Sequence, residues 1–160
     1  MKHTISVIVE NKPGVLSRVS GLFARRGFNI ESLAVGVTED PSVSRMTIVA
    51  EGDEKDLEQI VKQLYKLIDT LKVFDLPKDH SVERELALVK VAANEKTRSE
   101  ITQIADVFRA RVVDVSEGAL IIEISDETSK VDSMEEMLRK YGIQELVRTG
   151  TIALLRGGEE

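Results

Sequence analysis

The segment Asn11-Lys-Pro-Gly-Val-Leu16 holds residues well placed for chemistry, because it joins a strand-like alternation to a helix-periodic stretch. Gly14 lacks a Cβ that would block close approach of another molecule. The N–H groups of Val15 and Leu16 lie at the positive end of the expected helix dipole, where backbone groups bind carboxylates and other small anions. The predicted chemistry is ligand binding, since no comparable cluster of catalytic side chains occurs elsewhere in the sequence.

Asn29, at the start of the next expected strand, adds a second polar group. Its amide offers both an acceptor and donors, which suits a ligand that carries an ammonium and a carboxylate together. We therefore expect a free amino acid as the ligand. Apolar neighbours favour a branched aliphatic side chain on that ligand over a charged one, and these neighbours are Val15, Leu16, Ile30 and Val35.

The same residues also have a plain structural interpretation. Asn, Pro and Gly are the commonest residues of any strand-to-helix turn, and Asn29 follows Gly27 as an ordinary turn residue would. The second half of the chain favours the functional interpretation. Its equivalent turn, Asn94-Glu-Lys-Thr-Arg-Ser99, keeps the fold without a Pro-Gly pair, so only the first turn is specialised.

Hydrophobic periodicity in the first half predicts the element order βαββαβ, with strands at 4–10, 28–38, 44–51 and 71–76. Gly27 has the residue type of a C′ position for the first helix, and Asp53 that of an N-cap for the second. The apolar stripes of the two helices are Val15, Leu16, Val19, Leu22 and Phe23, and Leu57, Ile60, Val61, Leu64 and Ile68.

The second half repeats the plan after a polar stretch at 77–84 that indicates a linker. Strands are expected at 85–93, 111–116, 119–125 and 143–155. A capping box of Thr97 with Glu100 opens the third helix, and Ser129 or Thr128 caps the fourth, which Gly142 ends.

A βαββαβ unit folds as an antiparallel sheet with both helices on one face. The predicted fold class is thus α+β, with two ferredoxin-like domains at 1–76 and 85–160 joined by the linker 77–84. Many strand residues are apolar on both phases of the alternation, which favours coverage of the open face or the sheet edge by another subunit. We expect a homodimer.

Composition narrows the function further. The formal charge of −6 disfavours a nucleic-acid partner, and the absence of cysteine excludes disulfides and thiolate metal sites. No apolar run approaches the roughly 18 residues that span a bilayer, and no signal peptide opens the chain, so we expect a cytoplasmic protein without a membrane partner. We expect no metal ligands and no catalytic residues in this chain.

Two ferredoxin-like functions fit the residues poorly. An RNA-recognition module needs stacked aromatic side chains on its central strands, and Arg45-Met-Thr-Ile-Val-Ala50 has none. An acylphosphatase-like enzyme needs an arginine in the first loop to hold phosphate, and Lys12 is the only cation there.

The segments 5–19 and 21–33 resemble an ACT domain, the amino-acid-sensing module. The resemblance extends from about Ile5 to Arg156 and is closest to the regulatory small subunits of acetolactate synthase, also called acetohydroxyacid synthase. The amino-terminal motifs are the more specific ones. Further matching segments are Ser44-Arg-Met-Thr-Ile48, Gly52-Asp-Glu54, Gln59-Ile60, Gln63-Leu64, Lys66-Leu67 and Val82-Glu-Arg-Glu-Leu86.

This resemblance implies a regulatory role in branched-chain amino acid biosynthesis. The catalytic large subunit of such systems carries thiamine diphosphate, FAD and magnesium, whereas the small subunit binds none of these cofactors. It activates the large subunit and confers feedback inhibition, usually by valine bound between two ACT domains. The second domain would contribute to dimerisation and to large-subunit contact. Carried onto this chain, the effector site consists of Asn11, Gly14, Val15, Leu16, Asn29 and Ile30.

The competing function is a stand-alone ACT-type sensor that acts on another enzyme or on a regulator of transcription. Low basic content and the lack of a helix-turn-helix pattern count against direct DNA binding. The sequence does not rank valine against leucine or isoleucine.

Overall fold

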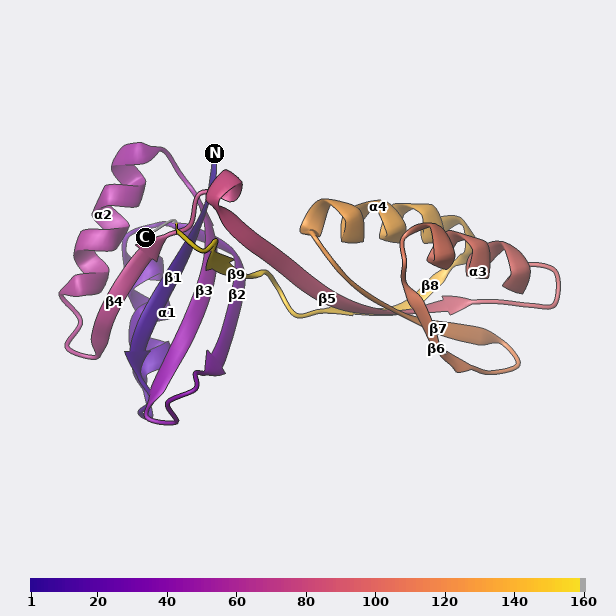
Figure 1. Cartoon of the computed structure of the whole chain (residues 1–160), viewed down its shortest axis with the longest axis horizontal. Coiled ribbons are helices and arrows are strands. Elements are labelled where there is room, and N and C mark those ends of the chain that lie inside the picture. Colours follow the sequence, from indigo (N-terminus) through magenta and orange to yellow (C-terminus); the bar gives the residue numbers. More distant parts are fainter. Residues whose placement is uncertain (159–160) are drawn as a thin grey trace. The chain divides into compact units, whose positions relative to one another are not determined.

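The computed structural model describes residues 1–158, and its elements repeat the βαββαβ order twice, which confirms the predicted ferredoxin-like α+β fold (Figure 1). By their contacts the described residues form two compact units: Met1–Val82 with residues 151–158, and Glu83–Gly150. The first unit contains β1 (Lys2–Glu10), α1 (Val15–Arg25), β2 (Asn29–Val37), β3 (Val43–Glu51), α2 (Glu54–Tyr65), β4 (Thr70–Asp75), a 3₁₀ turn (Lys78–His80) and β9 (Ile152–Leu155). The second contains most of β5 (Ser81–Ala92), then α3 (Arg98–Val107), β6 (Arg111–Val115), β7 (Ala119–Asp126), α4 (Thr128–Leu138), a 3₁₀ turn (Arg139–Tyr141) and β8 (Ile143–Arg148).

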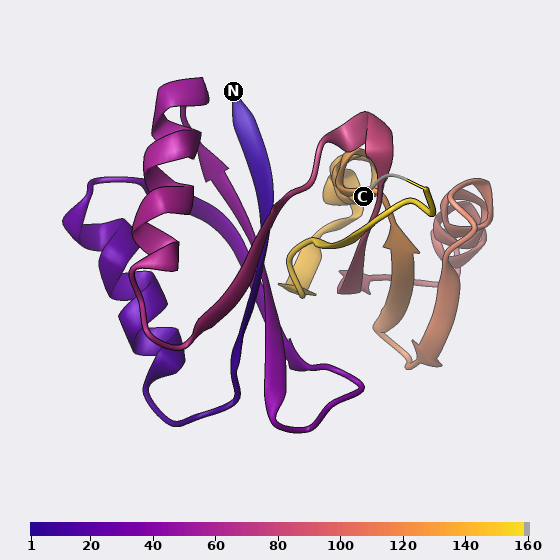
Figure 2. The same cartoon turned by 60° about the vertical axis from the view of Figure 1, so that its left-hand side comes forward.

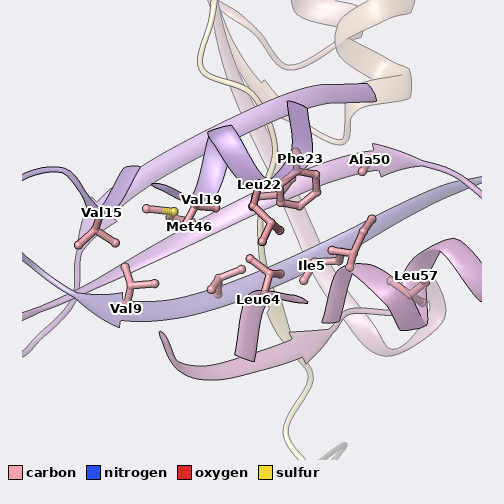
Figure 3. Close-up of a cluster of buried hydrophobic side chains, with 13 residues drawn as sticks. Ile5, Val9, Val15, Val19, Leu22, Phe23, Met46, Ala50, Leu57 and Leu64 are labelled. Carbon is pink, nitrogen blue, oxygen red and sulfur yellow. The ribbon is translucent and has the colours of Figure 1, made fainter. Parts of the chain in front are cut away.

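The first sheet is antiparallel with the strand order β2-β3-β1-β4. Helices α1 and α2 cover one face of it (Figure 2). Alternate residues of β1 are fully buried beneath them, as the period of two requires. The core between helices and sheet is shown in Figure 3, and it includes Ile5, Val9, Val15, Val19, Leu22, Phe23, Met46, Ala50, Leu57 and Leu64.

Gly27 is the C′ residue of α1, as predicted, and a Schellman motif ends this helix. The N–H of Gly27 donates to Ala24 O at 3.2 Å, and the N–H of Phe28 donates to Phe23 O at 3.0 Å. Gly27 has a φ of 73°, which glycine adopts without a Cβ clash. The rings of Phe23 and Phe28 meet edge to face at 6.3 Å, the apolar contact that accompanies this motif.

The predicted N-cap of α2 is confirmed as well, since Asp53 and Asp56 form a reciprocal capping box. The prediction of the apolar stripes is wrong for two residues. Leu16 is 45% exposed, and Ile68 is 92% exposed because α2 ends at Tyr65, before the helical period reaches it.

The second sheet has the order β6-β7-β5-β8, and β9 pairs with β5. The capping box predicted for α3 is absent: Asn94 Oδ1 accepts the N–H of Thr97 at 3.0 Å, and Glu100 accepts the hydroxyl of Tyr141 at 2.9 Å. Helix α4 begins at Thr128 with Glu127 in the N-cap position, so neither Thr128 nor Ser129 caps it. Gly142, with a φ of 96°, ends the 3₁₀ turn that extends this helix.

The chain around residues 77–84 and after 148 differs from the prediction. The expected linker contains a 3₁₀ turn and the first residues of β5, and the last expected strand is two strands, β8 and β9. Residues 151–158 group by contacts with the first unit. There the N–H of Thr151 donates to Ser32 Oγ at 2.9 Å, and Ala153 is buried.

An ion-pair network ties α4 to the second sheet. Arg148 donates two hydrogen bonds to Glu85, at 2.6 and 3.0 Å, and one to Asp132 at 2.7 Å. Thr128 Oγ1 also donates to Glu85, whose side chain is 5% exposed. Burial raises the pKa of the Glu85 carboxyl, but the hydrogen bonds from Arg148 and Thr128 lower it more, so its pKa lies below the ordinary value.

We expect Glu85→Gln to lower the free energy of unfolding at pH 7 by about 2 kcal/mol, because the neutral amide loses charge-assisted bonds to Arg148. Since the folded-state pKa of Glu85 is depressed, its contribution is present above the unfolded pKa and is lost as pH falls through the folded pKa. Urea unfolding from about pH 7 to about pH 3 should show a shallower acid-side decline in the variant.

Glu136→Gln is the matched control, because the Glu136 side chain is 75% exposed and its ion pair with Arg139 contributes little. Equal acid-side declines for Glu85→Gln and the wild type would contradict the role given to Glu85.

Candidate functional site

The specialised segment forms a tight turn before α1. Gly14 has φ 85° and ψ −9°, the conformation of the third residue of a type II turn, in which Pro favours the position before it. The N–H of Val15 closes this turn on Lys12 O at 3.4 Å. The pair Pro13-Gly14 is therefore required by the backbone, and the N–H of Val15, expected to face a ligand, has an acceptor within the turn.

The next backbone donors of α1 are free. Within residues 1–158 the N–H groups of Leu16 and Ser17 have no hydrogen-bond acceptor, whereas the N–H of Arg18 donates to Gly14 O at 3.0 Å. No side chain caps the helix, and its first turn holds no acidic residue. Two donors at the positive end of an uncapped helix are groups to which a small anion can bind.

Asn11 is held at the same end of the sheet. Its backbone N–H donates to Ser42 O at 2.8 Å, and its side-chain amide donates to Pro41 O at 3.0 Å. These bonds join the turn before α1 to the loop between β2 and β3. The exposed Asn11 side chain keeps its Oδ1, an acceptor that suits a ligand ammonium.

The charges around this turn cancel. Lys12 forms an ion pair with Glu10 at 2.8 Å, and the hydrogen bond to Glu10 raises the pKa of the Lys12 ammonium. Arg18 donates to Asp69 Oδ2 from Nε at 2.9 Å and from Nη2 at 2.7 Å. A site with balanced charges and free backbone donors suits a zwitterion better than a strongly charged anion.

Arg18 and Asp69 lie beside the turn before α1, and the sequence patterns did not identify them. A Cβ built on Gly14 would lie 3.0 Å from Arg18 Nη1, so the guanidinium packs directly beside the turn. The spacing from Gly14 to Arg18 places the two on one helix face. No local signal identifies Asp69 as the partner, because 51 residues separate it from Arg18.

Asn29 and Ile30 lie at the other end of the sheet. Strands β1 and β2 run in the same direction on either side of β3, so Asn11 follows the end of one strand and Asn29 begins the other (Figure 1). Asn29 pairs with Glu51, the last residue of β3, and the eight steps from Val43 to Glu51 span about 26 Å. One chain therefore does not bring the predicted site residues together.

The expected apolar lining is divided in the same way. The Val15 side chain belongs to the buried core, and Ile30 packs partly against that core. Leu16 is 45% exposed beside the free donors, and Val35 is 46% exposed on the β2 edge. Only Leu16 and Val35 present much apolar surface to a ligand or to another chain.

Neither a metal centre nor a membrane span occurs within the part of the chain that the structure describes. No group of three or more His, Asp or Glu side chains could hold a metal ion. No helix in residues 1–158 is long and apolar enough to cross a bilayer.

Family models match both halves of the chain. The AHAS small subunit-like ACT domain matches residues 5–72, and the model described as small subunit of acetolactate synthase matches residues 84–157. Together they cover most of the sequence and confirm the resemblance seen in its motifs.

Individual relatives agree with these models. The chain is 56% identical over 160 residues to a probable acetolactate synthase small subunit of Archaeoglobus fulgidus, with 100% of both chains covered. It is 51% identical to the acetolactate synthase small subunit of Mycobacterium leprae, over 97% of this chain and 92% of that protein. The crystal structure of the small subunit from Thermotoga maritima matches with a TM-score of 0.92 and 44% identity, covering 98% of each chain. The chain therefore belongs to the family of acetolactate synthase small subunits.

Proposed function

We propose that this chain is a non-catalytic regulatory subunit that activates the large subunit of acetolactate synthase and makes it subject to feedback inhibition by a branched-chain amino acid, with valine expected. The free N–H groups of Leu16 and Ser17, in a turn whose charges cancel, carry this proposal. They suit the carboxylate of a zwitterion. Thiamine diphosphate, FAD and magnesium would reside in the large subunit, and the holoenzyme would work in the cytoplasm.

The amino-terminal domain, residues 1–76, would bind the effector as a homodimer. Strand β2 is an edge strand with Val35 46% and Val37 59% exposed, so it can pair with a second copy of itself. Antiparallel pairing about a twofold axis places the start of one β2 beside the end of the other. The end of β2 pairs with Ser44 of β3, at the Asn11 end of the sheet.

This arrangement would complete the site that one chain leaves divided. Asn11, Gly14, Val15 and Leu16 would come from one protomer. The other half would be the partner subunit's Asn29 and the partner subunit's Ile30. The effector would bridge two chains, so its affinity would depend on how those chains are arranged. An effector changes catalysis only if it binds one such arrangement better than another.

Co-expression with the large subunit tests the function. We expect the chain to raise the acetolactate synthase rate and to make that rate sensitive to valine. Calorimetric titration of the chain with valine, leucine and isoleucine would identify the effector. Valine binding without any effect on the large subunit would instead favour a stand-alone sensor.

Gly14→Asp tests the anion site. The new carboxylate would stand where the carboxylate of the effector binds, and we expect inhibition by valine to weaken by at least about 10-fold while activation is retained. Any side chain at a φ of 85° adds strain, and Asn and Asp tolerate this region similarly. Gly14→Asn is thus the matched control for shape. Equal inhibition constants for Gly14→Asp and Gly14→Asn would contradict a carboxylate site at this turn.

Val35→Glu tests the dimer. A charge on the β2 edge should weaken self-association by at least about 10-fold, measured by sedimentation equilibrium, and valine binding should weaken with it. Gln59→Glu is the control, since Gln59 is exposed on α2, which packs against β4 at the edge of the sheet opposite β2. It should leave self-association and valine binding unchanged. A Val35→Glu variant that stays dimeric and binds valine normally would refute the proposed pairing.

A further inference from the structure

Three large apolar side chains protrude around the connection between α2 and β4. Ile68 is 92% exposed, Tyr65 is 52% exposed and Leu71 is 51% exposed. We call these three residues the α2–β4 surface. They belong to one short segment of the chain, at the end of α2, in the following turn and in β4. Exposed apolar side chains gathered in one segment mark contact sites for other proteins.

The α2–β4 surface is fixed in position by hydrogen bonds. The N–H of Thr70 donates to Leu67 O at 3.1 Å and closes the turn that carries Ile68. The Tyr65 hydroxyl accepts from the N–H of Val73 at 3.1 Å, which holds the ring against β4. A preformed surface loses little conformational entropy when it binds a partner.

The surroundings of this surface are basic, although the whole chain carries a net charge of −6. Lys62, Lys66 and Lys72 are exposed around it. Between Gln59 and Phe74 the only carboxylate belongs to Asp69, which is buried and paired with Arg18. The complementary partner is an apolar depression rimmed by Asp or Glu side chains.

Asp69 also connects this surface to the turn before α1. Its side chain holds Arg18, whose Nη1 would lie 3.0 Å from a Cβ on Gly14, and its carbonyl accepts the N–H of Glu10 at 2.9 Å. Ile68 is the residue next to Asp69. One ion pair and one peptide unit therefore separate Ile68 from the turn before α1.

We propose that the α2–β4 surface docks on the catalytic large subunit, with Ile68 inserted into an apolar depression rimmed by carboxylates. This inference rests on the proposed function. It adds the contact through which the effector turn acts: the Arg18–Asp69 ion pair joins the start of α1 to the docking residue. No other large apolar side chain within residues 1–158 is as exposed as Ile68.

The test is titration of the large subunit with full-length Ile68→Asp, reading out acetolactate synthase activity. We expect the concentration for half-maximal activation to rise at least about 10-fold, because a carboxylate replaces an apolar anchor and faces like charge. Val107→Asp is the matched comparison in the second unit, since Val107 is 77% exposed on α3. Its half-maximal concentration should rise less than that of Ile68→Asp, and an equal or larger rise would overturn the proposal. Calorimetric valine binding by Ile68→Asp should stay unchanged, which shows that the variant is folded.

A second variant tests the charges. Lys66→Glu combined with Lys72→Glu should also weaken activation, and the salt dependence of its half-maximal concentration should be smaller than that of the wild type. If the wild type activates the large subunit and Ile68→Asp activates it at the same half-maximal concentration, the docking surface is overturned. The proposed function would then remain intact. Failure of the wild type to activate would overturn both. A changed oligomeric state of Ile68→Asp in sedimentation would assign the surface to contacts between copies and overturn the proposal.

Discussion

Two backbone N–H groups at the start of α1 lack acceptors within the described chain, and the regulatory role proposed here depends on that deficit. Water satisfies such groups while they are exposed, at little energetic cost. If a second subunit covers this end of the sheet, the water is displaced and the donors require another acceptor. A ligand carboxylate is then favoured by the assembled interface, which makes effector binding and subunit arrangement two aspects of one equilibrium.

The two copies of the fold differ in the turn that precedes their first helix. Asn94 folds back on its own turn before α3 and accepts the N–H groups of Lys96 and Thr97. Asn11, at the corresponding point of the first unit, donates to Pro41 instead. The Pro13-Gly14 turn then closes on Lys12, and the following N–H groups stay unsatisfied. The same scaffold thus carries an internally satisfied turn in one half and a turn followed by unsatisfied N–H groups in the other.

Local signals allowed most of the fold to be predicted from the sequence. The period of apolar residues predicted both βαββαβ units, and Gly27 and Asp53 predicted helix ends because both act within one turn. Such local signals could not predict which side chains bond to one another or which strand ends lie together. Asn94 Oδ1 accepts the N–H of Thr97, which Glu100 was expected to accept in a capping box. The ion pair of Arg18 with Asp69 joins positions far apart in the chain. Asn29 was expected beside Asn11, but strand direction separates them by the length of β3.

The most direct measurement of the central claim is a ¹⁵N–¹H NMR titration of the dimer with the branched-chain effector. The account predicts downfield shifts of the Leu16 and Ser17 amide protons as they bind the effector carboxylate. The Asn29 side-chain amide should shift over the same concentration range, because it reaches the site from the other protomer. Shifts confined to other residues, with Leu16 and Ser17 unchanged at saturation, would contradict the account.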